Sequence, residues 1–204
     1  MRYLVTNLNA AEALASFVSD SLVRLYKPFG SVTIAQKEVS LVDVRWGVRL
    51  LSNCRLNDSH DLVMRLVSSK VQIFPFYFHV NVSGSCHAIV PPILESYRTA
   101  EGEQRYLLLD GSHRCYAALP SFTKISGLTV TFVSNPRPLP CNPLKASEIC
   151  VVESQPHLKD LFIGLAEQEF RPVRQLTHKA FRFESLGEAL TAMNLSSSAL
   201  SQLE

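Results

Sequence analysis

The segment RYLLLDGSHRCYAAL constrains the fold more than any other part of the chain. The apolar run at residues 106–109 has the composition of a strand, and residues 113–119 favour a helix. Gly111 stands between the two, where a residue without a Cβ lets the backbone turn sharply. The pattern predicts a central strand that runs directly into a helix.

The turn between strand and helix carries polar groups suited to binding an anion. Asp110 can hold a divalent cation, hydrogen-bond a hydroxyl or cap the helix, and His113 can donate to a phosphate or move a proton near neutral pH. Arg114 offers a planar fork of donors, and the backbone amides at Gly111 and Ser112 add partial positive charge. These residues predict a phosphate-binding turn.

The same residues have a purely structural interpretation. An Asp-Gly pair before a helix is a common cap, and an arginine in a first helical turn is usually a solvated charge. The flanking residues favour function, because the strand before the turn is fully apolar and therefore central, and Ala117 and Ala118 permit close packing of helix on sheet.

Composition indicates a folded chain with one hydrophobic core. The 204 residues are 47% hydrophobic and 19% charged, and a formal charge of +2 gives little support for a large nucleic-acid interface. Five cysteines without a CxxC pair indicate reduced thiols and a cytoplasmic compartment. We expect neither a secretory signal nor a membrane span.

Outside the turn, periodicity predicts the remaining elements. Apolar residues at helical spacing predict a helix over residues 10–26, and branched residues predict one or two strands over 32–46 around a turn near Lys37. A short helix should begin at Asn57 or Asp58. Further expected segments are an apolar strand at 71–82, an apolar run at 88–94, a polar turn at 99–104 and a strand at 127–134.

These elements predict an α/β protein, a mixed sheet with flanking helices, in three parts. Residues 1–31 should form an N-terminal helix packed on the core, and residues 32–146 should form the core itself. The proline-rich stretch before residue 146 marks a domain edge. Residues 147–204 are expected to form a helical C-terminal extension.

The central region resembles the superfamily of ParB-like partition domains, sulfiredoxins and free-serine kinases. The resemblance covers about residues 32–134 and consists of the Pro-Ile-Leu segment at 92–94, a polar turn, the strand at 106–109, the DGSHR turn, an alanine-bearing helix and a strand at 128–133. It implies a ParB/sulfiredoxin-like core whose Gly-x-His-Arg turn grips nucleotide phosphates.

The residues of the turn differ from those of some branches of this superfamily, and these differences exclude some of the activities found in it. Ser112 stands where sulfiredoxins carry their catalytic cysteine, so we do not expect sulfiredoxin chemistry, and Cys115 should point elsewhere. ParB-like proteins bind a cytidine nucleotide through a Gly-Glu-Arg-Arg version of this turn, which the chain lacks. The Asp-Gly-x-His-Arg turn looks closest to that of the free-serine kinases.

The implied activity is nucleotide-dependent phosphoryl transfer to a small hydroxyl-bearing metabolite. The resemblance implies ATP, ADP or CTP as nucleotide, Mg²⁺ at Asp110, and catalytic roles for Asp110 and His113. Phosphoryl transfer also needs a base for the acceptor hydroxyl. Glu38 is the first candidate and Asp43 the second. The pattern favours an enzyme, a small-molecule kinase or a nucleotide hydrolase, without deciding it.

The alternative function is a ParB-like, nucleotide-binding regulator that contacts DNA with weak or no catalysis. Its DNA-binding face would be a stripe of basic residues on a C-terminal helix, Arg171, Arg174, His178 and Arg182. A solvated basic stripe explains the same residues. No membrane partner is expected, a homodimer is compatible with the sequence, and the oligomeric state stays open.

Overall fold

The computed structural model describes residues 2–6, 8–68, 77–80, 85–134, 139, 142–156, 182–184, 188–189, 191 and 200–203. The helices in these residues are α1 (Leu8–Tyr26), α2 (Asn53–Ser68) and α3 (Ser112–Ala118), with the 3-10 turns η1 (Leu41–Asp43) and η2 (Ala146–Glu148). The strands are β1 (Arg2–Thr6), β2 (Val32–Ser40), β3 (Val44–Trp46), β4 (Leu50–Ser52), β5 (Tyr77–Val80), β6 (Cys86–Ile89), β7 (Ile93–Arg98), β8 (Gln104–Asp110), β9 (Lys124–Phe132), β10 (Cys150–Val152), β11 (Arg182–Phe183) and β12 (Leu200–Leu203).

The main sheet of the described chain has five strands in the order β2-β9-β7-β8-β3. The β2–β9 and β7–β8 pairs are antiparallel, whereas β7–β9 and β3–β8 are parallel. The strand β8 is therefore paired on both sides, as its apolar sequence predicted. The fold is a mixed α/β arrangement, which confirms the predicted fold class at this level.

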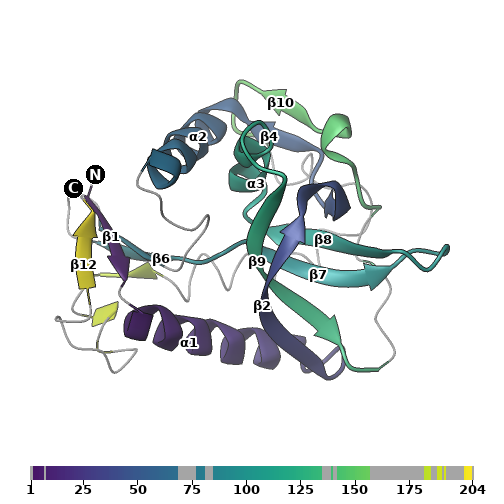
Figure 1. Ribbon diagram of the computed structural model, residues 1–204, viewed down its shortest axis with the longest axis horizontal. Helices are drawn as coiled ribbons and strands as arrows, with labels where there is room; N and C mark the ends of the chain where they lie inside the picture. The colour runs from purple at the N-terminus through teal and green to yellow at the C-terminus, as the bar shows by residue number, and fades with distance from the viewer. Residues whose placement is uncertain are drawn as a thin grey trace.

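Helix α1 covers one face of the main sheet (Figure 1). Leu14, Val18 and Leu22, spaced four residues apart, are fully buried, as the helical periodicity of this segment predicted. The helix ends at Tyr26, whose carbonyl accepts the backbone N–H of Gly30. The Tyr26 hydroxyl donates to Glu95 Oε2 of β7 at 2.8 Å, so α1 is tied to the sheet by a buried hydrogen bond.

Helix α3 packs against α2, and both lie with β4 and β10 at the other side of the main sheet in Figure 1. Cys115, Ala117 and Ala118 are the buried residues of α3, so its small side chains permit the close packing that the sequence predicted. Strand β9 also lies close to its neighbour β7 and to the segment before it. A Cβ on Gly127 would lie 2.4 Å from Leu94 Cδ1 and 3.1 Å from the Pro92 carbonyl oxygen, so a larger residue here would force its neighbours to shift.

A second sheet joins segments that are distant in the sequence, in the order β11-β6-β5-β1-β12. Strand β1 pairs with β12, so the first and last described segments of the chain lie side by side (Figure 1). The expected helical C-terminal extension is wrong for much of the described part, because β10, β11 and β12 all fall after residue 147. Residues 188, 189 and 191 are helical, and residues 157–181 lie outside the described residues.

Other local predictions differ from the structure at their boundaries. Strand β2 continues through Lys37, and the chain turns later, at η1. Helix α2 begins at Asn53, before the expected cap, and reaches Ser68. The β7–β8 hairpin around the polar turn is confirmed, while most of the expected strand at 71–82 lies outside the described residues. No helix within the described residues is long and apolar enough to cross a membrane.

Candidate functional site

The turn from Asp110 to Arg114 lies between the end of β8 and the start of α3. Gly111 has φ 90° and ψ 18°, a left-handed conformation that side chains with a Cβ rarely adopt. Its carbonyl accepts the backbone N–H of Cys115 at 2.9 Å, which starts the helix. A Cβ at Gly111 would also lie 3.2 Å from Pro92 Cα, so both conformation and space select glycine here.

Arg114 joins the turn to the segment that precedes β7. Its Nη1 donates to the Val90 carbonyl, and its Nη2 lies 3.3 Å from Asp110 Oδ2. The Arg114 side chain is 14% exposed and the Asp110 side chain 25% exposed. Arg114 is therefore mostly buried and links two chain segments. It is not the solvated charge that the purely structural interpretation of the turn predicts.

His113 connects α3 to the end of β4. The backbone N–H of Ser52 donates to His113 Nε2 at 3.1 Å. A backbone N–H can only donate, so the Nε2 lone pair is the acceptor in this contact. This contact brings the start of α2 next to the turn.

Cys115 does not supply a reactive thiol beside the turn. Its side chain is fully buried, and this burial raises its pKa to about 12, with Arg114 lowering and Asp110 raising the value by smaller amounts. A thiol with this pKa is protonated at neutral pH and is a poor nucleophile.

The structure does not bring Glu38 to the turn. Glu38 lies on β2, where its Oε1 accepts from Lys124 Nζ at 2.7 Å and its side chain is 65% exposed. The Glu38 carboxylate raises the pKa of Lys124 through this hydrogen bond. Strands β9 and β7 separate β2 from β8, which carries Asp110. The role of Glu38 as a catalytic base stays a prediction.

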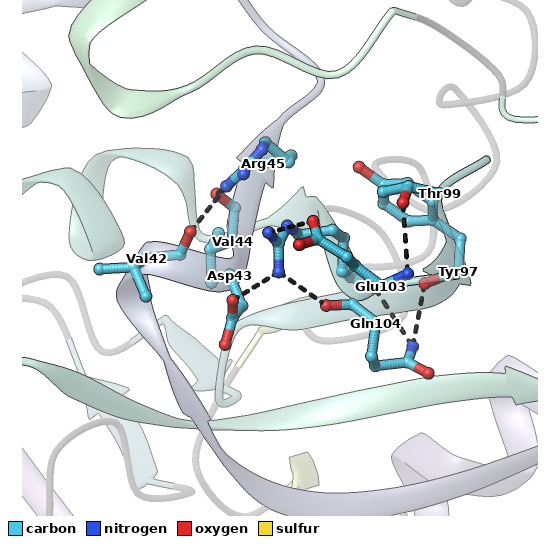
Figure 2. Close-up of polar contacts among 9 residues, drawn as sticks. Val42, Asp43, Val44, Arg45, Tyr97, Thr99, Glu103 and Gln104 are labelled. Atoms are coloured by element: carbon cyan, nitrogen blue, oxygen red, sulfur yellow. Dashed lines mark hydrogen bonds and ion pairs between the residues drawn. The ribbon is translucent and has the colours of Figure 1, made fainter. Parts of the chain in front are cut away.

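Asp43 lies at the opposite end of β8 from the turn. Its Oδ1 accepts from Arg105 Nη1 at 2.8 Å, beside the turn of the β7–β8 hairpin (Figure 2). Arg105 also pairs with Glu103 at 2.6 Å. Arg105 is near the first residue of β8 and Asp110 is the last, so this charge network and the DGSHR turn are separate sites.

Asp110 could supply only one of the ligands of a magnesium ion. The described residues contain no cluster of three or more His, Cys, Asp or Glu side chains that could hold a metal ion. Asp110 offers a single carboxylate, which already lies beside the Arg114 guanidinium. Magnesium commonly keeps several waters and binds through one or two carboxylates plus substrate phosphates. The donor set therefore fits an ion that arrives with a nucleotide.

Ser52 and Val90 are site residues that sequence reasoning missed. Ser52 is 61 residues from His113, and Val90 is 24 residues from Arg114. Both act through backbone groups, which leave no signature in side-chain composition, so nothing in a single sequence could have found them.

The predicted DNA-binding stripe is largely untested by the structure. Arg171, Arg174 and His178 lie outside the described residues, whereas Arg182 belongs to strand β11 and pairs with His87 of β6. Arg182 is therefore not on the expected helical face.

Comparison with known proteins adds no assignment. No protein-family model, curated protein or solved structure matches this chain. The function must be argued from the site itself.

Proposed function

We propose that this chain is a nucleotide-binding protein with a ParB/sulfiredoxin-like core that transfers a phosphoryl group to a small hydroxyl-bearing metabolite. One observation carries the proposal. A single turn gathers the Asp110 carboxylate, the imidazole of His113 and the half-buried guanidinium of Arg114. The mixed sheet supports it, because the turn follows the β7–β8 hairpin and precedes β9 in the order that the resemblance implies.

Arg114 is the proposed phosphate ligand. Its 3.3 Å contact with Asp110 is longer than the ~2.7–2.9 Å typical of strong charge-assisted hydrogen bonds, so an incoming phosphate oxygen can replace this partner at modest cost. The Val90 carbonyl would keep the guanidinium in place during that exchange. A cation positioned before the ligand arrives loses little conformational entropy on binding.

The other groups of the turn would complete phosphate binding. The Ser112 amide and the His113 ring would donate to phosphate oxygens, and Asp110, once released by Arg114, would ligate the magnesium ion of the nucleotide. Bound magnesium would neutralise charge on the phosphates. Phosphoryl transfer depends mainly on such positioning and charge stabilisation, which this turn can supply without a covalent intermediate.

The proposed reaction also requires a base. The acceptor hydroxyl oxygen bonds to the terminal phosphorus, the bond from that phosphorus to the bridging oxygen breaks, and the hydroxyl proton passes to a carboxylate or to water. Glu38 remains our candidate for this base. Its use requires a substrate that extends from the turn across β7 and β9 to strand β2.

Calorimetric titration of ATP, ADP, CTP and GTP in the presence of magnesium tests the proposal, with Arg114→Ala and Arg105→Ala as matched variants. Both arginines are partly buried, ion-paired and near opposite ends of β8, but only Arg114 lies in the turn. We expect at least one nucleotide to bind, Arg114→Ala to weaken it about tenfold or more, ~1.4 kcal/mol, and Arg105→Ala to leave the affinity unchanged.

The unfolding temperature of each variant serves as the control, because Arg114→Ala also removes the contact with Val90. Absence of binding by the native chain, or equal losses in both variants, would contradict the proposal. Binding without phosphorylation of any hydroxyl acceptor would instead favour the nucleotide-binding regulator. In that case the affinity of the chain for DNA should fall steeply as the salt concentration rises.

A further inference from the structure

The register of the second sheet places two histidines directly opposite each other. His79 of β5 and His87 of β6 are partners in the antiparallel β5–β6 pair. Directly opposite residues of such a pair lie on the same face of the sheet, with Cβ atoms about 4.5–5.5 Å apart. We propose that His79 and His87 form a cross-strand site for a divalent transition-metal ion such as Zn²⁺ or Ni²⁺. This proposal is independent of the function proposed above.

The spacing of these two positions suits a single metal ion. A zinc ion lies about 2.0–2.1 Å from each imidazole nitrogen that binds it, so two such nitrogens are at most about 4 Å apart. An imidazole carries its nitrogens beyond Cβ, so two rings that start about 5 Å apart can converge on one ion while the backbone keeps its register. Imidazole is also a ligand type that zinc, copper and nickel share.

The sheet face that carries both histidines is the more polar face of β5 and β6. The opposite face of these two strands carries the hydrophobic residues Phe78, Val80, Cys86 and Ala88, whereas the histidine face carries His79, His87, Tyr77 and Ile89. Antiparallel sheets commonly pack one face on the core and leave the other in contact with water. The alternation therefore favours a histidine face that a metal ion from solution can reach.

Two imidazoles are an incomplete set of metal ligands. Zinc in proteins is most often four-coordinate, and zinc sites that act on substrates keep a position for water. Water would fill the positions that His79 and His87 leave open. The proposed site is therefore one from which the metal exchanges, and not a closed structural centre.

Arg182 occupies the register position on the other side of His87. It is the partner of His87 in the short β11–β6 pair, so Arg182, His87 and His79 form one row across neighbouring strands. A positive charge in this row opposes the binding of a cation, whereas it would favour the binding of an anion. A substitution at Arg182 therefore distinguishes a metal site from an anion site built on the same row.

Calorimetric titration of Ni²⁺ into the chain without a histidine tag tests the site. Nickel is the probe because imidazole suits it, whereas the exposed thiols of Cys54 and Cys150 select zinc. We expect one Ni²⁺ per chain, and a loss of affinity of about tenfold or more, ~1.4 kcal/mol, in His79→Ala and in His87→Ala. His60→Ala is the matched control, since His60 is an exposed histidine on α2, and it should keep the native affinity.

Two measurements on the native chain keep the test valid if a histidine variant fails to fold. Ni²⁺ is paramagnetic, so a substoichiometric amount should broaden the amide signals of His79 and His87 before those of β7 and β8, which belong to the other sheet. Because the two histidines are opposite each other only in the folded hairpin, Ni²⁺ should also raise the unfolding temperature.

Arg182→Gln should bind Ni²⁺ at least as tightly as the native chain does, because it removes a positive charge from the row. Weaker binding by Arg182→Gln would overturn the proposal. Absence of Ni²⁺ binding by the native chain, native affinity in folded His79→Ala or His87→Ala, or first broadening away from β5 and β6 would each overturn it as well.

Discussion

Gly111 and Gly102 both adopt a positive φ, 90° and 83°, but their surroundings differ. A Cβ at Gly102 would meet nothing within 4 Å, whereas one at Gly111 would lie 3.2 Å from Pro92 and from Arg114 Nη2. We predict that Gly102→Ala costs about 1 kcal/mol of stability from backbone strain alone. Gly111→Ala should cost about 1–2 kcal/mol more, because Pro92 must also move.

Equilibrium unfolding in urea checks this pair of glycine variants. Equal losses of stability in the two variants would show that the segment around Pro92 yields freely, and would contradict the close packing of the turn described above. The comparison uses each glycine as the control for the other, since both replace a residue of left-handed conformation.

The cysteines give a second prediction at the residue scale. Cys115 is fully buried with a pKa raised to about 12, whereas Cys54 and Cys150 are exposed. We predict that iodoacetamide alkylates Cys54 and Cys150 in the folded chain at mildly alkaline pH, and Cys115 only after denaturation, as read by peptide mass mapping. Rapid alkylation of Cys115 in the folded chain would mean that the thiol is accessible and ionises, contrary to its placement in α3.

The raised pKa of Cys115 also predicts how the stability of the folded chain depends on pH. Its pKa of about 12 when folded exceeds the value of 9.0 for an unperturbed thiol. Between these two values the unfolded chain releases the proton while the folded chain retains it, so alkaline pH favours unfolding. The contribution of the neutral thiol to stability is therefore complete below pH 9.0 and decreases above it.

At the scale of elements, the contact between α1 and β7 depends on a buried hydrogen bond. Tyr26 and Glu95 are 1% and 2% exposed, and the hydroxyl lies 2.8 Å from the carboxylate. Tyr26→Phe keeps the ring against Phe29 and Phe132 and removes only the donor. We predict a loss of about 1–3 kcal/mol in unfolding free energy, because the buried carboxylate loses a partner.

A double-mutant cycle with Glu95→Gln isolates this contact. The amide oxygen that this substitution introduces is a weaker acceptor than a carboxylate, so Tyr26→Phe should cost less in that background. If Tyr26→Phe costs the same in both backgrounds, the loss arises from something other than the hydrogen bond to Glu95.

Elements with a strong local signal were predictable from sequence. The α1 periodicity places Leu14, Val18 and Leu22 on one buried face, and the apolar run before Asp110 forms the doubly paired strand β8. The short C-terminal strands could not be predicted in this way. A strand of two to four residues shows no period, so its pairing is set by distant partners.

The candidate site was also predictable only where its residues are neighbours in the sequence. Asp110, Gly111 and Arg114 meet because they are neighbours in the chain, and that proximity follows from the sequence. The contacts with Ser52 and Val90 depend on how distant segments pack, and no local pattern encodes them. The role of His113 in the proposed reaction stays a prediction, while its contact with Ser52 is a feature that only the structure shows.

At the scale of the whole molecule, the pairing of β1 with β12 links distant parts of the chain in one sheet. Deleting residues 200–204 would remove β12, so the edge of β1 that pairs with β12 would lose its backbone hydrogen-bond partners. We predict that amide hydrogen exchange in β1 then becomes faster, while β7, β8 and β9 keep their protection because they belong to the other sheet. Equal loss of protection in both sheets would show that they unfold as one unit.

The central claim is that the turn from Gly111 to Arg114 binds nucleotide phosphate. Amide chemical-shift mapping with the nucleotide and magnesium tests this claim most directly, because it reports on each residue. We predict saturable shifts at Gly111, Ser112, His113 and Arg114, with no shift at Arg105 near the other end of β8. The absence of saturable shifts in the turn, or larger shifts around Arg105, would contradict it.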